Sequence, residues 1–455
     1  MKYIKNILFM LMVVAGIFTS CNTSRPLADI NTANLYRDTT VTDTSNLSNL
    51  PWKEIFTDVA LQNLIQEGLN NNLDLQIASA RLKQAEANFL QSKMGLLPSL
   101  NANGDVSLNK KGDNAFNHTY SVSLSSSWEL DIWGKLSSAK RASKMLLLKS
   151  DAYKRAVQTQ LVANIATYYY TLLAYDAKLN ITLKTIENAK QDVETMKQLK
   201  ESNVVNGAAV MQSQASLYSS EVTIPDLKRS IRETENNLCA LLGRPSGSVS
   251  RTQIESQNIT SDLKTGIPAQ LLANRPDVQE AEYVVRYAYE MTNVARAYFY
   301  PTLSITAEGG LSNNNLSKLF DPTSVFANII GGIAQPLFNK GLNKQRLAVA
   351  KANQEEYVAT FKQTLLNAGQ EVSNALYEYQ TATDKISLRT QQIKYLEKSV
   401  EFTKELLQYS SATNYTDVLT SEQSLLSAQL NSVNDKQQQL QAVVKLYRSL
   451  GGGWK

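Results

Sequence analysis

The stretch that decides the fold is the apolar series Val358, Phe361, Leu365, Ala368, Val372, Ala375, Tyr379, Ala382, Ile386, Ile393, Leu396, Val400 and Leu407. Its steps alternate between three and four residues, and only Arg389 and Thr403 interrupt it. A mean step of about 3.5 residues keeps one stripe of an α-helix against a partner helix and imposes a left-handed supercoil. We therefore predict a helix over about 342–407, roughly 100 Å long.

The first half of the chain carries a series of the same kind. It predicts a long helix over about 136–199 and, after a turn, a return helix over 208–242. Pro225 lies inside the return helix and should kink it, because proline removes one helical hydrogen bond. The stretch 136–242 is therefore predicted to be a long antiparallel helix pair.

The two halves correspond to one another along their length. Pro98 and Pro301, for example, are 203 residues apart, and the residues between Asp74 and Pro98 keep that offset. Such self-similarity indicates an internal duplication. We predict a first structural repeat over 51–268 and a second over 269–455, whose own helix pair covers 341–450.

Between the helices, the period of the sequence changes to two. Apolar side chains alternate with hydroxyl, amide and carboxyl side chains, which predicts strands at about 99–109, 119–131, 302–311 and 325–337. Runs of about ten alternating residues are typical of transmembrane barrel strands with a wet lumen. A soluble antiparallel sheet with one solvated face would show the same period.

The N-terminus is predicted to be a targeting segment. Lys2 and Lys5 precede an apolar run too short to span a bilayer, which indicates a signal peptide over 1–20. Small residues stand directly before Cys21, as in a bacterial lipobox, so we expect Cys21 to be acylated. An ordinary signal peptide beside an incidental cysteine is the alternative. The stretch 21–50 is rich in Thr, Asn and Ser and is predicted to be an extended lipidated arm.

Composition argues against several other functions. The net charge of +5 is small and scattered over 455 residues, which does not favour nucleic-acid binding. His118 is the only histidine, and Cys21 and Cys239 are the only cysteines, so neither a metal site nor a disulfide framework is expected. No catalytic constellation and no phosphate-binding loop is evident. We predict that the protein is not an enzyme and needs no cofactor.

The number of strands limits the possible assemblies. Four strands cannot close a barrel, and an open sheet would leave edge amides unpaired in lipid. Three copies would supply twelve strands and enclose a lumen. We therefore predict a mainly α-helical chain whose four strands contribute to a 12-stranded membrane β-barrel, above a 12-helix tunnel, in a homotrimer.

Four stretches carry a resemblance to a known family. They are Pro51 to Ala78, Trp128 to Lys135, Ile267 to Pro301 and Leu450 to Trp454. In these stretches the chain resembles the TolC-like outer-membrane efflux factors, in particular their lipoprotein branch. The resemblance covers essentially the whole mature chain, and Arg275 to Glu282 lies in its most diagnostic part.

The resemblance implies a lipid-anchored homotrimer in the bacterial outer membrane, with its helical tunnel in the periplasm. It also implies two partners, a periplasmic adaptor protein and an inner-membrane pump. The channel would passively conduct small molecules such as drugs, delivered by a pump of the resistance-nodulation-division (RND) class. The exit duct of a type I protein-secretion or ABC system is one alternative, and a periplasmic coiled-coil scaffold is another.

In the family, the two helical turns form the periplasmic mouth. Here they fall at 203–207 and 410–415, and Asn and Gly in them tolerate the positive φ of a tight reversal. The resemblance places Asp417 and Tyr415 at the periplasmic gate, where three copies would form a carboxylate ring. A helix-capping role for Asp417 is compatible with this one. The expected adaptor-contacting residues are Asn203, Asn206, Gly207, Ser410, Ala412 and Asn414.

Overall fold

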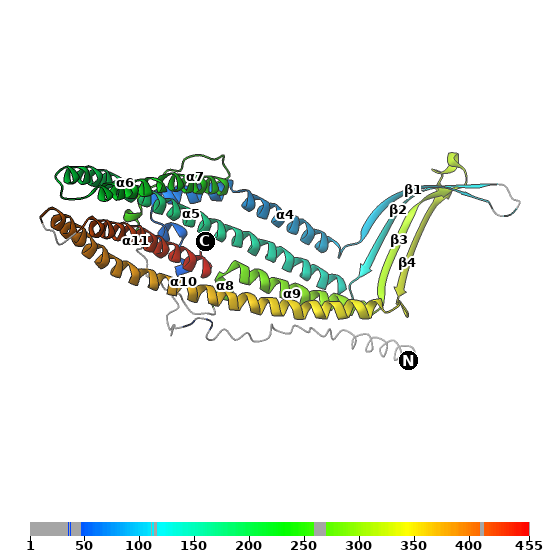
Figure 1. The fold of residues 1–455 in the computed structure, drawn as a ribbon. Coiled ribbons are helices and arrows are strands. Elements are labelled where there is room, and N and C mark those ends of the chain that lie inside the picture. The colour runs from blue at the N-terminus through cyan, green and yellow to red at the C-terminus, as the bar shows by residue number, and fades with distance from the viewer. Residues whose placement is uncertain are drawn as a thin grey trace. The chain divides into compact units, whose positions relative to one another are not determined.

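A computed structural model of the chain describes residues 47–110, 116–258, 270–409 and 414–454, together with Leu35, Arg37 and Gly112. The elements are η1 Leu47–Asn49, α2 Trp52–Ile55, α3 Val59–Asn71, α4 Leu73–Met94, β1 Ser99–Asn109, β2 Asn117–Leu130, α5 Lys135–Glu201, α6 Gly207–Glu221, α7 Thr223–Leu241, η2 Ile254–Ser256, α8 Gln270–Asn274, α9 Pro276–Ala297, β3 Thr302–Asn313, η3 Leu316–Lys318, η4 Pro322–Ser324, β4 Val325–Ala334, α10 Leu342–Tyr409 and α11 Tyr415–Ser449 (Figure 1). The predicted fold class, mainly helical with four strands, is confirmed for the described residues.

The chain forms two compact units, and each takes segments from both halves of the sequence. One unit contains 82–150 and 280–362. The other contains 151–279 and 363–455, together with the described residues 47–81. The two predicted repeats, 51–268 and 269–455, therefore do not coincide with the compact units of the fold.

The first unit contains one antiparallel sheet in the order β1-β2-β3-β4 (Figure 1). β1 covers Ser99–Asn109 as predicted. β2 begins at Asn117, two residues before its predicted start, and β3 ends at Asn313, two residues after its predicted end. β4 ends at Ala334 instead of 337. The reason is Pro336, which lacks the N–H that a continuing ladder needs.

The two longest helices agree closely with the apolar series. α5 begins where both carboxylate oxygens of Asp131 accept the N–H groups of Leu136 and Ser137, at 2.8 and 2.7 Å. α10 extends from Leu342 to Tyr409, and every member of the series that predicted it is buried or half-buried. The stripe of alternating steps is therefore the packed face of α10.

The return helix of the first half is interrupted near the position where a kink was expected. α6 ends at Glu221 and α7 begins at Thr223, with Val222 between them. Pro225 lies in the first turn of α7, where a proline is tolerated because the first N–H groups of a helix have no partner within it. The interruption is local, because Val222 keeps helical dihedrals and donates its N–H to the Tyr218 carbonyl at 2.9 Å.

The core of the second unit gathers around α5. Ile165, Tyr169 and Leu172 of this helix are fully buried, as are Leu61 of α3 and Leu238 of α7. In the described part of the chain, no helix combines the length and the apolar character needed to cross a bilayer.

Candidate functional site: the paired helical turns

The turn between α5 and α6 is built on two asparagines. Asn203 has a φ of +59°, and the next N–H, from Val204, is donated to the Leu199 carbonyl at 2.8 Å. Asn206 caps α6 by accepting the Ala209 N–H at 3.1 Å. The left-handed position expected of this turn therefore falls on Asn203. Gly207 is already the first residue of α6 and does not have a positive φ.

The start of α11 is a reciprocal cap. Asn414 Oδ1 accepts the Asp417 N–H at 3.3 Å, and Asp417 Oδ2 accepts the Asn414 N–H at 3.2 Å. This is the capping box, which satisfies two helix-terminal donors at once. Of the other predicted site residues, Ser410, Ala412 and Cys21 lie outside the described residues.

An apolar cluster holds the two turns together. Its buried members come from four helices and are Met196, Val210, Leu407, Tyr415, Val418 and Leu419. Tyr415 is 5% exposed, whereas the side chain of Asp417 is exposed. Burial raises the pKa of Tyr415 to about 12, with the charges of Glu422 and Asp192 as further causes. Of the two predicted gate residues, Asp417 is therefore accessible and Tyr415 is part of the packing.

A cluster of three charged side chains lies next to the apolar cluster. Lys404 Nζ of α10 lies 2.9 Å from Asp192 Oδ1 of α5 and 2.6 Å from Glu422 Oε1 of α11. Asp192 and Glu422 are 17% and 22% exposed. Sequence reasoning missed this cluster. The available signal was that Asp192 and Lys404 lie next to the apolar seams predicted for the two long helices.

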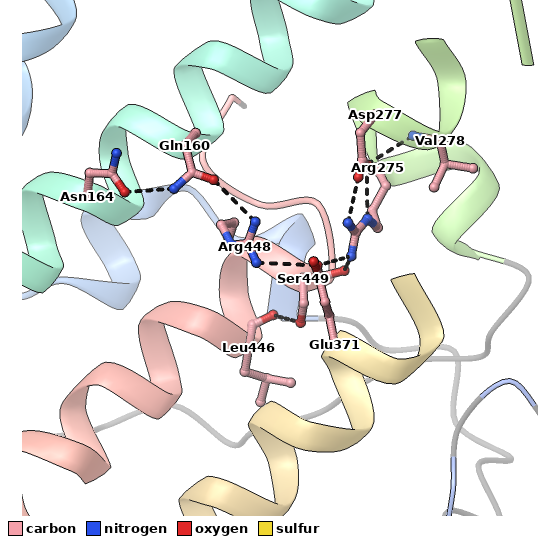
Figure 2. Close-up of polar contacts among 9 residues, drawn as sticks. All are labelled: Gln160, Asn164, Arg275, Asp277, Val278, Glu371, Leu446, Arg448 and Ser449. Carbon is pink, nitrogen blue, oxygen red and sulfur yellow. Dashed lines mark hydrogen bonds and ion pairs between the residues drawn. The ribbon is translucent and has the colours of Figure 1, made fainter. Parts of the chain in front are cut away.

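Figure 2 shows a second polar cluster, around Arg275 at the start of α9. Arg275 is 5% exposed, and its guanidinium donates to both Asp277 oxygens, to Glu371 and to the Ser449 carbonyl. Arg448 lies 3.3 Å from the same Glu371 oxygen. The motif that carried the family resemblance thus joins α9, α10 and the end of α11.

The arrangement defines a class of protein: a subunit with two long helical hairpins, whose turns pack on each other, and one amphipathic antiparallel sheet. The family model described as "Outer membrane efflux protein" matches residues 64–244 and 267–452. The chain therefore belongs to the outer membrane efflux protein family.

Similarity to individual relatives extends over most of the chain. The chain is 31% identical over 414 residues to the cation efflux system protein CusC of Escherichia coli O6:H1, with 90% of each chain covered. It is 30% identical over 407 residues to the probable outer membrane lipoprotein SilC of Salmonella typhimurium, with 89% of this chain and 88% of SilC covered.

Solved structures of outer-membrane channels match the fold of this chain as well. A crystal structure of CusC matches with a TM-score of 0.84 at 29% identity, covering 92% of this chain and 99% of that one. The structure of the outer-membrane channel OprN matches with a TM-score of 0.86 at 25% identity, covering 95% of this chain and 97% of the OprN chain. The protein is thus an outer-membrane efflux channel, and the prediction that it is not an enzyme is confirmed by the family.

Proposed function

We propose that three copies of this chain close a 12-stranded barrel through the free edges of β1 and β4, and that the resulting pore is the exit duct of a tripartite efflux system. The observation that carries this proposal is the sheet itself. Within the described chain, β1 pairs only with β2, and β4 pairs only with β3. Unpaired strand edges are not tolerated in lipid, so a second copy has to satisfy them.

The two faces of the sheet support a membrane location for it. One face presents large apolar side chains to the surroundings, among them Leu100, Val106, Leu124, Ile329 and Ile333, which are 56–77% exposed. An exposed apolar surface of this kind indicates contact with lipid or with another protein.

The opposite face of β1, β2 and β3 is polar. The Ser123 hydroxyl of β2 donates to Glu308 Oε1 of the neighbouring β3 at 2.8 Å. The Asn103 amide of β1 donates to the Ser125 hydroxyl of β2 at 3.0 Å. Asn101, Ser121 and Thr306 lie on the same face by register. Side chains that bond to one another and to water suit a hydrated lumen.

We infer further that the paired turns form the periplasmic mouth and meet a periplasmic adaptor served by an RND-type inner-membrane pump. The names of the relatives support an efflux role, since CusC is a cation efflux system protein and TtgC a probable efflux pump outer membrane protein. The accessible residues of the turns, Asn203, Asn206, Gly207, Asn414 and Asp417, are the proposed contacts.

Two measurements test the duct and its partner. Purified protein in planar bilayers should give discrete conductance steps, whereas a coiled-coil scaffold should give none. In cells, a cysteine in place of exposed Asn203 should be cross-linked by a short reagent to the adaptor encoded beside an RND pump. Asn88→Cys, also exposed, is the matched control on α4. Cross-linking of Asn203→Cys to a type I secretion component instead would support that alternative.

We also propose acylation at Cys21, as the lipobox resemblance implies. Cys21→Ser should abolish incorporation of labelled palmitate. Undiminished labelling of that variant would refute the assignment.

A further inference from the structure

We propose that Asp192, Lys404 and Glu422 form a proton-controlled latch, which holds the two helical turns together in acid and loosens them in base. The inference rests on the proposed function, in which these turns form the periplasmic mouth, and adds a way of regulating it. Three helices meet in the latch, α5 from the first half of the chain and α10 and α11 from the second.

The charge count of the cluster is the first argument. One ammonium group lies between two carboxylates, so the fully ionised cluster carries one excess negative charge. Taking such a charge out of water is costly, because the low-dielectric surroundings strengthen repulsion and replace few of the lost hydrogen bonds. The excess charge is removed when one carboxyl group takes up a proton.

Unsatisfied bonding capacity is the second argument. Asp192 Oδ1 accepts from Lys404, but Asp192 Oδ2 is buried and has no hydrogen-bond partner among the described residues. A proton on Glu422 allows the two carboxyl groups to bond instead of repelling each other. Burial and the adjacent Asp192 carboxyl together raise the pKa of Glu422 from its ordinary 4.5 to about 7, against the lowering effect of Lys404.

The other groups at this level do not remove the excess charge. Tyr415 of α11 stays neutral because its own pKa is about 12, and the group that α6 brings to it is the neutral hydroxyl of Ser213. Lys404 is thus the cation facing Asp192 and Glu422 among the described residues.

The position of the cluster links protonation to the turns. On each of the three helices, the charged residue is three or four positions from a member of the apolar cluster: Asp192 from Met196, Lys404 from Leu407, and Glu422 from Val418. Repulsion between α5 and α11 at this level therefore acts on the packing that holds the turns together.

The sign of the pH dependence follows from linkage. A carboxyl group with a raised pKa binds its proton more tightly in the packed state than when it is exposed to water. The packed state therefore loses stability as pH rises from about 4.5 to about 7, and the full penalty is present above that range. The mouth should be tightest in mildly acidic medium.

Hydrogen exchange of the full-length protein in lipid nanodiscs tests the latch at about pH 5.5 and about pH 8, after correction for the intrinsic exchange rate. In the natural protein, protection of peptides from 187–199 and 415–426 should fall at least about threefold between the two conditions. Glu422→Gln and Asp192→Asn each leave one carboxylate for one ammonium, so protection should become nearly independent of pH. Glu405→Gln, an exposed neighbour of Lys404, should behave like the natural protein.

Equal protection of the natural protein at both pH values would overturn the latch, as would an undiminished fall in both Glu422→Gln and Asp192→Asn. This readout does not depend on conduction. A protein that shows the exchange pattern but no conductance would contradict the proposed duct and leave the latch standing.

Discussion

Asn414 and Asp417 cap each other at the start of α11, so the residue expected at the gate also holds the end of its own helix. The two roles use different properties of Asp417. Capping needs an oxygen acceptor, whereas attraction of cations to the mouth needs a charge.

The first prediction separates these properties by substitution. Asp417→Asn keeps an acceptor and removes the charge, whereas Asp417→Ala removes both. We expect Asp417→Ala to destabilise the start of α11 by about 1 kcal/mol and Asp417→Asn to cost less. Both should lower the preference of the channel for cations, measured as the reversal potential in a salt gradient. Unchanged reversal potentials in both variants would remove Asp417 from the conduction path.

The second prediction concerns the Arg275 cluster. Arg275→Ala removes the buried guanidinium from Asp277 and from the buried Ser449 carbonyl, whereas Glu371 keeps Arg448, and the loss should cost about 1–3 kcal/mol. The matched control is Arg229→Ala, because Arg229 and its partner Asp226 are 66% and 73% exposed. The control should cost about 0–1 kcal/mol. Thermal unfolding at one heating rate should show a clear drop in midpoint only for Arg275→Ala, and equal drops would contradict a central role for the cluster.

Most of the helical framework follows from the sequence, because it depends on local periodicity. The apolar series predicted α10 almost to the residue, and strict alternation did the same for β1. The interruption at Val222 was only partly predicted. Pro225 indicates that the helix is disturbed, but it does not indicate at which residue upstream the disturbance falls. Pro336 similarly shortened β4 relative to its apolar pattern.

The charged clusters were not predictable in the same way. Lys404 and Asp192 are 212 positions apart, and Arg275 contacts a carbonyl 174 positions away. Such contacts depend on which faces of distant helices meet, and side-chain spacing within one helix does not contain that information. The turns themselves could be located, but the burial of Tyr415 could not.

The third prediction concerns Gly451, near the C-terminus, with Gly247 as its control. Gly451 has a φ of +90°, and a Cβ there would lie 2.4 Å from the Asn274 carbonyl oxygen. Gly451→Ala should therefore destabilise the protein by about 1–3 kcal/mol. At Gly247 a Cβ meets nothing within 4 Å, so Gly247→Ala should be neutral or slightly stabilising. Comparing the unfolding midpoints of the two variants tests this, and the prediction fails if Gly451→Ala is tolerated equally well.

The fourth prediction compares the two faces of β1. Val106→Arg places a charge on the apolar face, where lipid contact would cost up to about 2–4 kcal/mol. Asn103→Arg places the same charge on the polar face, three residues away, and should be tolerated. The yield of assembled protein in outer-membrane fractions measures the difference. Similar yields would contradict a lipid-facing Val106.

The most direct test of the central claim, that three copies close one wall, is disulfide trapping between β1 and β4. Asn103→Cys on β1 is combined with Asn328→Cys or Ile330→Cys on β4, in a Cys239→Ala background. Two strands separate these positions within one chain, a distance beyond the roughly 4.4–6.8 Å between Cα atoms that a disulfide spans. We predict that oxidation gives a closed species of three chains and nothing larger. Chains that remain monomeric at every register, or that grow into an open ladder, would contradict the account.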